Sequence, residues 1–86
     1  MEQFSMKYNK KLNPILEYFE AEGYDISKSM YNNGLVIVLN QEKVVSINTH
    51  NDSFEITLYE HNEPISTDFV EGLNEIVDQI YWWEKE

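Results

Sequence analysis

The sequence predicts an α+β fold of two layers, in which a three- to four-stranded antiparallel meander is flanked by an N-terminal and a C-terminal helix (αββββα). Apolar residues recur at helical spacing near both ends of the chain and alternate with polar residues between them. Short polar turns separate the alternating segments, and connections this short force neighbouring strands to run antiparallel. With 86 residues, we expect the chain to form a single domain over residues 1–86.

The first helix is predicted over residues 14–22. Its apolar residues at helical spacing are Leu12, Ile15, Leu16 and Phe19. Asn13 is expected to cap the helix, with Pro14 at the first helical position and Gly23 in the left-handed conformation after the last turn. Residues 4–12 form either a further helical stretch, kinked at Pro14, or a loose arm.

The middle of the chain alternates with a period of two residues, as strands do. Turns are predicted at Asn32-Asn33-Gly34, Gln41-Glu42-Lys43 and His50-Asn51-Asp52-Ser53, and the sheet is expected to end at His61-Asn62-Glu63-Pro64. The run from Leu35 to Asn40 is apolar and β-branched and is expected to be a central strand. The face covered by the helices would hold Ile26, Met30, Val45, Ile47, Phe54, Ile56 and Leu58. The other face would hold Ser27, Ser29, Tyr31, Ser46, Asn48, Glu55, Thr57 and Tyr59.

The last helix is predicted over residues 68–84. Asp68 with Glu71 three residues later matches a capping box. One apolar seam follows, made of Phe69, Leu73, Ile76, Ile80 and Trp83 and widened by Val70 and Val77. Gly72 within this helix is expected to permit close packing at a cost of about 1 kcal/mol relative to Ala.

The composition favours a protein that binds proteins rather than nucleic acids. The chain contains sixteen Asp and Glu residues, six Lys and no Arg, which gives a formal net charge of -10. Nucleic-acid readout depends on Arg and on basic patches, so direct binding to DNA or RNA is not expected. The sequence has no Cys, its longest apolar run covers only residues 35–39, and it does not start with an apolar segment. We therefore expect a cytoplasmic protein without membrane contact.

The sequence carries no catalytic motif, and we expect a non-enzymatic protein without cofactor or metal. The turns that begin at His50 and His61 suggest a two-histidine metal site. They lie at opposite ends of the strand predicted over residues 54–60, however. Seven residues at about 3.3 Å each separate the turns by roughly 23 Å, which is too far for one shared ion.

Two surfaces are candidates for binding a partner. On the last helix, Glu71, Glu75, Asp78 and Trp82 lie opposite the apolar seam, and an exposed Trp is typical of binding hot spots. The alternative is that the last turn unwinds and both Trp rings fold onto the edge of the sheet. The second surface is the uncovered sheet face around Tyr31, Glu55 and Tyr59, where tyrosines stand among small polar residues. The alternative there is a plain solvated face.

Glu71, Glu75, Asp78 and the other acids, on a compact chain of helix, sheet and helix, resemble the small acidic anti-CRISPR proteins of phages and prophages in low-GC Gram-positive hosts. A Lys-only basic set and many Asn and Ile residues fit such a genome. The resemblance implies inhibition of the RNA-guided nuclease of a type II system, in some members as a DNA mimic, in the host cell cytoplasm. It also implies that the basic residues near the start of the chain, Lys7, Lys10 and Lys11, face away from the partner.

Two functions are therefore expected from different classes. The first is a non-enzymatic inhibitor that places carboxylates on a basic, nucleic-acid-handling protein, because a cleft built for phosphates accepts a surface of suitably spaced negative charge. The second is a homodimeric regulatory or accessory protein without DNA mimicry, in which Trp82 and Trp83 are buried in a self-interface. A mimic would lose its partner steeply with rising salt, whereas an apolar homodimer would persist.

Overall fold

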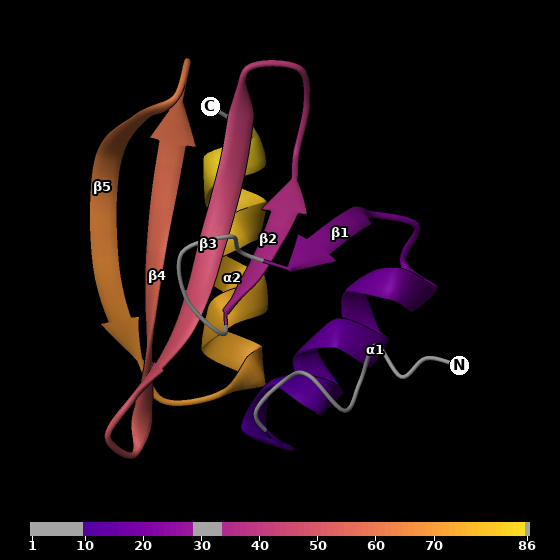
Figure 1. Cartoon of the computed structure of the whole chain (residues 1–86), viewed down its shortest axis with the longest axis vertical. Helices are drawn as coiled ribbons and strands as arrows, with labels where there is room; N and C mark the ends of the chain where they lie inside the picture. The colour runs from indigo at the N-terminus through magenta and orange to yellow at the C-terminus, as the bar shows by residue number, and fades with distance from the viewer. Residues whose placement is uncertain (1–9, 29–33, 86) are drawn as a thin grey trace.

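The computed structural model describes residues 10–28 and 34–85, which form a five-stranded sheet with two α-helices packed against it (Figure 1). The elements are the 3-10 helix η2 (Lys10–Leu12), α1 (Asn13–Ala21), β1 (Asp25–Lys28), β2 (Leu35–Val38), β3 (Lys43–His50), β4 (Ser53–Glu60), β5 (Glu63–Val70) and α2 (Leu73–Lys85). All neighbouring strands are antiparallel and lie in the order β1-β2-β3-β4-β5. The predicted α+β class and meander are confirmed, with one strand more than predicted.

One hydrophobic core fills the space between the sheet and the helices. Its buried members are Leu12, Ile15, Leu16 and Phe19 from the first helical segment, Leu35, Ile37, Val45, Ile47, Phe54, Ile56 and Leu58 from the strands, and Ile76, Ile80 and Trp83 from α2. Strands β3 and β4 alternate between buried and half-buried residues, so their predicted covered face is confirmed. Ile26 is half-buried against this core, and Met30 lies outside the described residues.

The first helix ends as the sequence predicts. Gly23 has a φ of 93°, and the N–H of Tyr24 donates to the carbonyl of Phe19 at 3.0 Å. The Tyr24 and Phe19 rings also meet edge to face, with centroids 5.3 Å apart. This pairing of a backbone bond with an apolar contact is the Schellman ending, which requires a residue that tolerates positive φ.

The predicted N-cap is wrong. Asn13 is the first residue of α1, and the residue before it, Leu12, has a helical backbone conformation with no capping side chain. The Oδ1 atom of Asn13 is buried without a hydrogen bond to the described chain. Because η2 leads directly into α1, no residue there takes the extended conformation that an N-cap needs.

Compact turns connect the strands. Asn40 Oδ1 accepts the N–H groups of Glu42 and Lys43 at 2.8 and 2.9 Å, an Asx-type turn between β2 and β3. Asn51 has a φ of 54° in the turn between β3 and β4. The hairpin turn predicted at Asn32-Asn33 lies outside the described residues, and so does the 4–12 segment before Lys10.

Strand β5 corrects the prediction that the sheet ends at residues 61–64. His61 and Asn62 both have positive φ, 54° and 67°, so they form a two-residue turn that sends the chain back along β4. Thr57 and Thr67 then face each other, with their hydroxyl oxygens 3.1 Å apart. Pro64 is tolerated because it lies near the start of an edge strand, where its missing N–H breaks no ladder.

The predicted start of the last helix at Asp68 is also wrong. Asp68 belongs to β5, opposite Ile56, and α2 begins at Leu73. The Glu75 carboxylate, rather than Asp68, reaches back to this end of the helix, where its Oε1 accepts the N–H of Glu71 at 2.6 Å. Gly72 precedes the helix, and a Cβ added there would meet nothing within 4 Å, so it has no close-packing role.

Candidate functional site

Helix α2 places two neighbouring tryptophans on opposite sides. Trp83 is buried in the core with Ile76 and Ile80 and is only 5% exposed. Trp82, one residue earlier, is 60% exposed. Successive residues of an α-helix lie about 100° apart around its axis, so the two rings cannot share one face. The helix phase that the sequence predicts for this pair is confirmed.

The last turn of α2 is bound to the body of the protein. Lys43 Nζ, at the start of β3, donates to the carbonyl oxygen of Trp83 at 3.1 Å. A cation at this position also complements the negative end of the helix dipole. The Tyr24 hydroxyl donates to Glu84 Oε1 at 2.7 Å. The alternative in which the last turn unwinds, so that both Trp rings fold onto the sheet edge, is therefore wrong.

Gln79 adds a link between α2 and the edge of the sheet. With its amide oriented to suit its neighbours, the Gln79 nitrogen donates to Asp68 Oδ2 at 2.8 Å, and its oxygen accepts from Trp83 Nε1 at 3.2 Å. Asp68 thus orients the buried indole through Gln79 instead of capping the helix. This chain of contacts fixes the phase of α2 and therefore the outward position of Trp82.

The four residues predicted to lie opposite the apolar seam, Glu71, Glu75, Asp78 and Trp82, are here called the acidic stripe, and all four are exposed. Glu75, Asp78 and Trp82 point outward from α2, and Glu71 is exposed in the connection that precedes the helix. Glu71 is not on the helix as predicted, but the bond from its N–H to the Glu75 carboxylate keeps the two residues adjacent. Three carboxylates and a large aromatic ring are therefore available to a partner along one side of the molecule.

Sequence reasoning missed Tyr81 and Lys85. Tyr81 is 58% exposed, and Lys85 Nζ lies 5.0 Å from the centre of its ring and 5.9 Å from the centre of the Trp82 ring. This is the range of a cation–π contact. The signal was the run of three aromatic residues that ends at Trp83, because such a run covers about 200° of a helix and cannot be buried as a whole.

An open acidic groove lies beside the end of α2. It has a volume of about 590 Å³ and is lined by Glu22, Gly23, Tyr24, Asp25, Val38, Leu39, Asn40, Gln41 and Glu84. Burial raises the pKa of the Tyr24 hydroxyl, as do the hydrogen bond to Glu84 and the negative charges of Glu84 and Glu22, to about 12. The hydroxyl therefore stays protonated and holds the Glu84 carboxylate in place.

The second predicted surface is less exposed than expected. Glu55 and Tyr59 are half-buried on the sheet face that the helices leave uncovered, and Tyr31 lies outside the described residues. Tyr59 pairs across the strand with Val44, so its neighbours are less polar than predicted. Since α2 packs on the other face of the sheet, the two predicted partner-binding surfaces do not meet.

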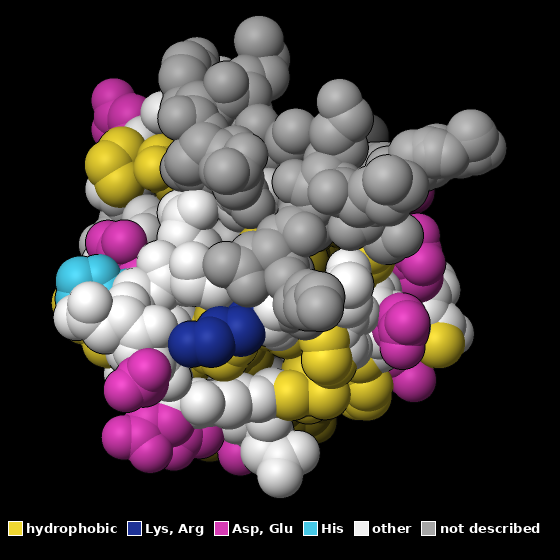
Figure 2. Space-filling view, turned by 60° about the horizontal axis from the view of Figure 1, so that its bottom comes forward, with side chains coloured by type: hydrophobic (Ala, Val, Ile, Leu, Met, Phe, Trp, Pro, Cys, Tyr) yellow, Lys and Arg dark blue, Asp and Glu magenta, His cyan; other side chains and the backbone are white. Residues whose placement is uncertain are grey.

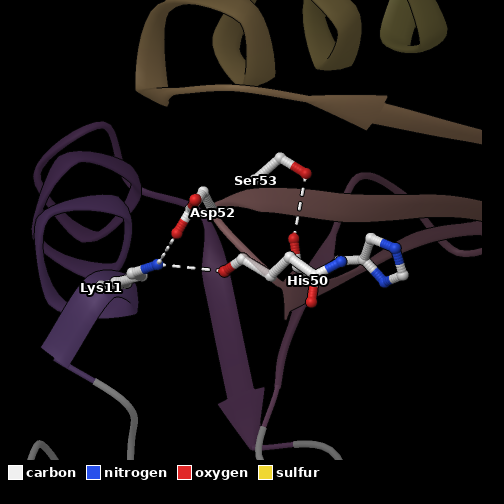
Figure 3. A network of polar contacts seen from close by, with 5 residues as sticks. Lys11, His50, Asp52 and Ser53 are labelled. Atoms are coloured by element: carbon white, nitrogen blue, oxygen red, sulfur yellow. Dashed lines mark hydrogen bonds and ion pairs between the residues drawn. The ribbon is translucent and has the colours of Figure 1, made fainter.

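The 3-10 helix η2, which carries Lys11, lies at the opposite end of the sheet from the last turn of α2 (Figure 1). Lys11 Nζ donates to the carbonyl of Asn51 at 3.1 Å and lies 3.9 Å from Asp52 Oδ1, in the turn between β3 and β4 (Figure 3). Figure 2 brings this end of the molecule forward. It shows a small central patch of Lys side chains (dark blue) with Asp and Glu side chains (magenta) on both sides of it. Lys11 is therefore remote from Trp82 in the last turn of α2. Glu71, which directly follows Val70 opposite Phe54, is at the same end of the sheet as the turn that Lys11 contacts.

The two histidine turns lie at opposite ends of β4, as predicted. Within residues 10–28 and 34–85, no group of three or more His, Asp and Glu side chains could hold a metal ion. No helix of the described chain is long and apolar enough to cross a membrane. Comparisons with protein-family models, curated proteins and solved structures found no match.

Proposed function

We propose that this chain is a non-enzymatic inhibitor that binds a basic, nucleic-acid-handling protein through the exposed side of α2. The observation that carries the proposal is the position of Trp82, 60% exposed on a helix whose last turn is bound to the body. Exposing a Trp forgoes its burial energy, and such rings are enriched at the centres of binding sites. A fixed helix also presents the ring with little ordering cost on binding.

The charges beside Trp82 define the chemistry of the partner. Glu71, Glu75 and Asp78 are exposed, and the chain as a whole carries a net charge of -10. A cleft that binds phosphates through Lys and Arg offers complementary charge, which accelerates association and aligns the two surfaces. Tyr81 extends the apolar contact, since it is exposed next to Trp82.

The partner class that best fits this surface is an RNA-guided nuclease of a type II system, inhibited by occupation of its DNA-binding cleft. The resemblance to small acidic anti-CRISPR proteins supports this choice, and the inhibitor would then act in the cytoplasm of the host cell. The position of η2 also supports it. Lys11 in this segment binds the turn between β3 and β4, at the opposite end of the sheet from the last turn of α2, and would lie away from a basic cleft that binds Trp82.

A displacement assay tests the proposal. A guide-loaded type II nuclease is bound to a fluorescent target duplex, and the purified chain is added at increasing salt. We expect the chain to release the duplex, with an effect that weakens steeply as salt rises. The double variant E75K/D78K should lose this activity.

The matched control is E17K/E20K, which makes the same change of charge at exposed positions of α1. It should displace the duplex nearly as well as the original chain. Equal losses in both double variants would mean that only net charge matters, and no displacement by the unmodified chain would remove this nuclease class as the partner.

The adjacent exposure of Tyr81 and Trp82 favours a second candidate function, a homodimeric accessory protein that buries these rings in a self-interface. Sedimentation at low and high salt separates the two. A dimer that persists at high salt and dissociates in W82A would support the accessory protein, whereas a monomer under both conditions supports the inhibitor.

A further inference from the structure

The two edges of the sheet differ in length and in cover. Strand β1 has four residues and lies against α1, whereas β5 has eight residues (Figure 1). In the part of the chain that the structure describes, no element lies beyond β5 on its outer side (Figure 1). An edge strand presents backbone N–H and C=O groups that can pair with a further strand.

Protection of the β5 edge is confined to its first residues. Pro64 lacks an N–H, and a register shift between Leu58 and Tyr59 of β4 disturbs the ladder beside it. From Ser66 to Val70, β5 pairs with β4 residue by residue, and this stretch contains neither Pro nor Lys. Five consecutive residues therefore form a regular strand edge without the features that usually block pairing with a further strand.

Two large apolar side chains are exposed along this edge. Ile65 is 55% exposed and Phe69 is 59% exposed. Phe69 lies across from Glu55, and its ring centre is 5.0 Å from that of His50. An added strand would cover the Phe69 ring with side chains of its own, because neighbouring strands lie about 4.8 Å apart.

The hairpin behind the edge is strongly acidic. Residues 53–70 contain Glu55, Glu60, Glu63 and Asp68 and no Lys or Arg. Asp68, the single charged residue of the regular stretch, faces α2 through its bond to Gln79. A second copy of this chain would bring four more carboxylates against these four, which opposes self-pairing. A strand that carries Lys or Arg would instead neutralise them.

We propose that the β5 edge binds an extended, basic peptide segment of a partner protein, in which apolar residues alternate with Lys or Arg, as a sixth strand of the sheet. Backbone hydrogen bonds to residues 66–70 supply the pairing, and Phe69 supplies the apolar contact. Alternate residues of a strand point to opposite faces, so when the apolar side chains meet Phe69 the basic ones lie on the face of Asp68, within the negative field of the β4–β5 hairpin. This site is separate from the exposed side of α2 and does not depend on the function proposed for Trp82.

The test uses an eight-residue peptide, the length of β5, in which Val and Lys alternate. Binding to the isotope-labelled full chain is followed by NMR of the backbone amides. We expect shifts concentrated in residues 65–70, and slower hydrogen exchange at alternate amides of that stretch, because only every second N–H of an edge strand points outward. The same peptide with N-methylated backbone amides on one side keeps its charge and should not bind.

Two matched variants locate the site. F69K and W82K each replace an aromatic residue of nearly equal exposure, 59% and 60%, and make the same change of charge. We expect F69K to weaken peptide binding about tenfold, and W82K to leave it nearly unchanged.

Three outcomes would overturn the proposal. One is an equal loss in both variants, and another is a set of shifts centred on α2, since each would place the peptide elsewhere. The third is a free chain that already sediments as a dimer with protected β5 amides, which would make a second copy the occupant. Failure of the nuclease displacement assay would leave the peptide result unaffected, so the two proposals can fail separately.

Discussion

Trp82 and Trp83 are neighbours in the sequence, yet one is 60% exposed and the other 5%. Trp83 lies in the core beside Ile80, and its indole N–H binds Gln79. Trp82 has Lys85 above its ring at 5.9 Å. The pair shows that a helix of fixed phase gives two adjacent residues opposite environments, so that one ring stabilises the core and the other is exposed at the surface.

The largest expected effect is on the buried member of the pair. Trp83→Ala should lower the free energy of unfolding by roughly 3–5 kcal/mol, because it leaves a cavity in the core. Trp82→Ala should change it by no more than about 0.5 kcal/mol, as is usual for an exposed residue. Chemical denaturation of both variants measures the difference. A larger loss for Trp82→Ala would mean that the helix phase is wrong.

The next largest effect is on partner binding, where we expect the exposed Trp82 to matter more than the buried Trp83. Trp82→Ala should weaken binding to the basic partner protein by about 2 kcal/mol or more, as truncation of a hot-spot residue does. Reversing the charges of Glu71, Glu75 and Asp78 together should slow association and flatten its salt dependence, with the melting temperature little changed. Titration calorimetry and stopped-flow kinetics measure the two effects. Unchanged binding in both variants would make this side of α2 ordinary solvated surface.

A smaller effect tests what holds the helix phase. Lys43→Met keeps the aliphatic stem but removes the bond to the Trp83 carbonyl, and should cost about 0.5–1.5 kcal/mol of stability. Lys85→Met removes an exposed charge from the same end of α2 and should cost less. Thermal unfolding of both variants at equal salt gives the comparison. Equal losses would show that the dipole, and not the specific bond, anchors the last turn.

The smallest effect is a pH dependence of stability that comes from the hydrogen bond between the Tyr24 hydroxyl and Glu84, the second contact that holds the last turn of α2. The pKa of Tyr24 is raised from 10.0 to about 12, first by burial and then by Glu84. A raised pKa means that the neutral hydroxyl contributes stability that is complete below pH 10.0 and is lost as the pH rises towards about 12. The advantage of the original chain over Tyr24→Phe in unfolding free energy should therefore shrink across that window. A constant difference would contradict the anchoring role of the hydroxyl.

Predictions from the sequence succeeded where a local pattern had a single structural solution. Gly23 follows the end of α1 because the positive φ needed there is unfavourable for residues with a side chain. Ile76, Ile80 and Trp83 are buried because they repeat at the helical period and so share one face of α2. The candidate residues on α2 followed from that phase. Tyr81 was missed because it lies between the seam and the stripe and belongs to neither pattern.

The failures occurred where one local pattern fits two structures. Asp68 and Glu71 have the spacing of a capping box, but β4 had an unpaired edge after the turn at His61, and pairing along it drew residues 63–70 into a strand. The ladder of backbone bonds outweighs one capping bond. Asn13 failed as a cap for a similar reason, because the preceding turn was already helical.

By itself, the sequence determined the α+β class, the alternation that fills the core, and the opposite positions of Trp82 and Trp83, because each follows from a period of residues along one element. Only the tertiary structure decided where α2 begins and that β5 exists. It also decided which groups fix the end of α2, since Lys43 lies in β3, Tyr24 in the connection between α1 and β1, and Asp68, the partner of Gln79, in β5. Contacts between elements distant along the chain depend on how those elements pack, and no local period encodes them.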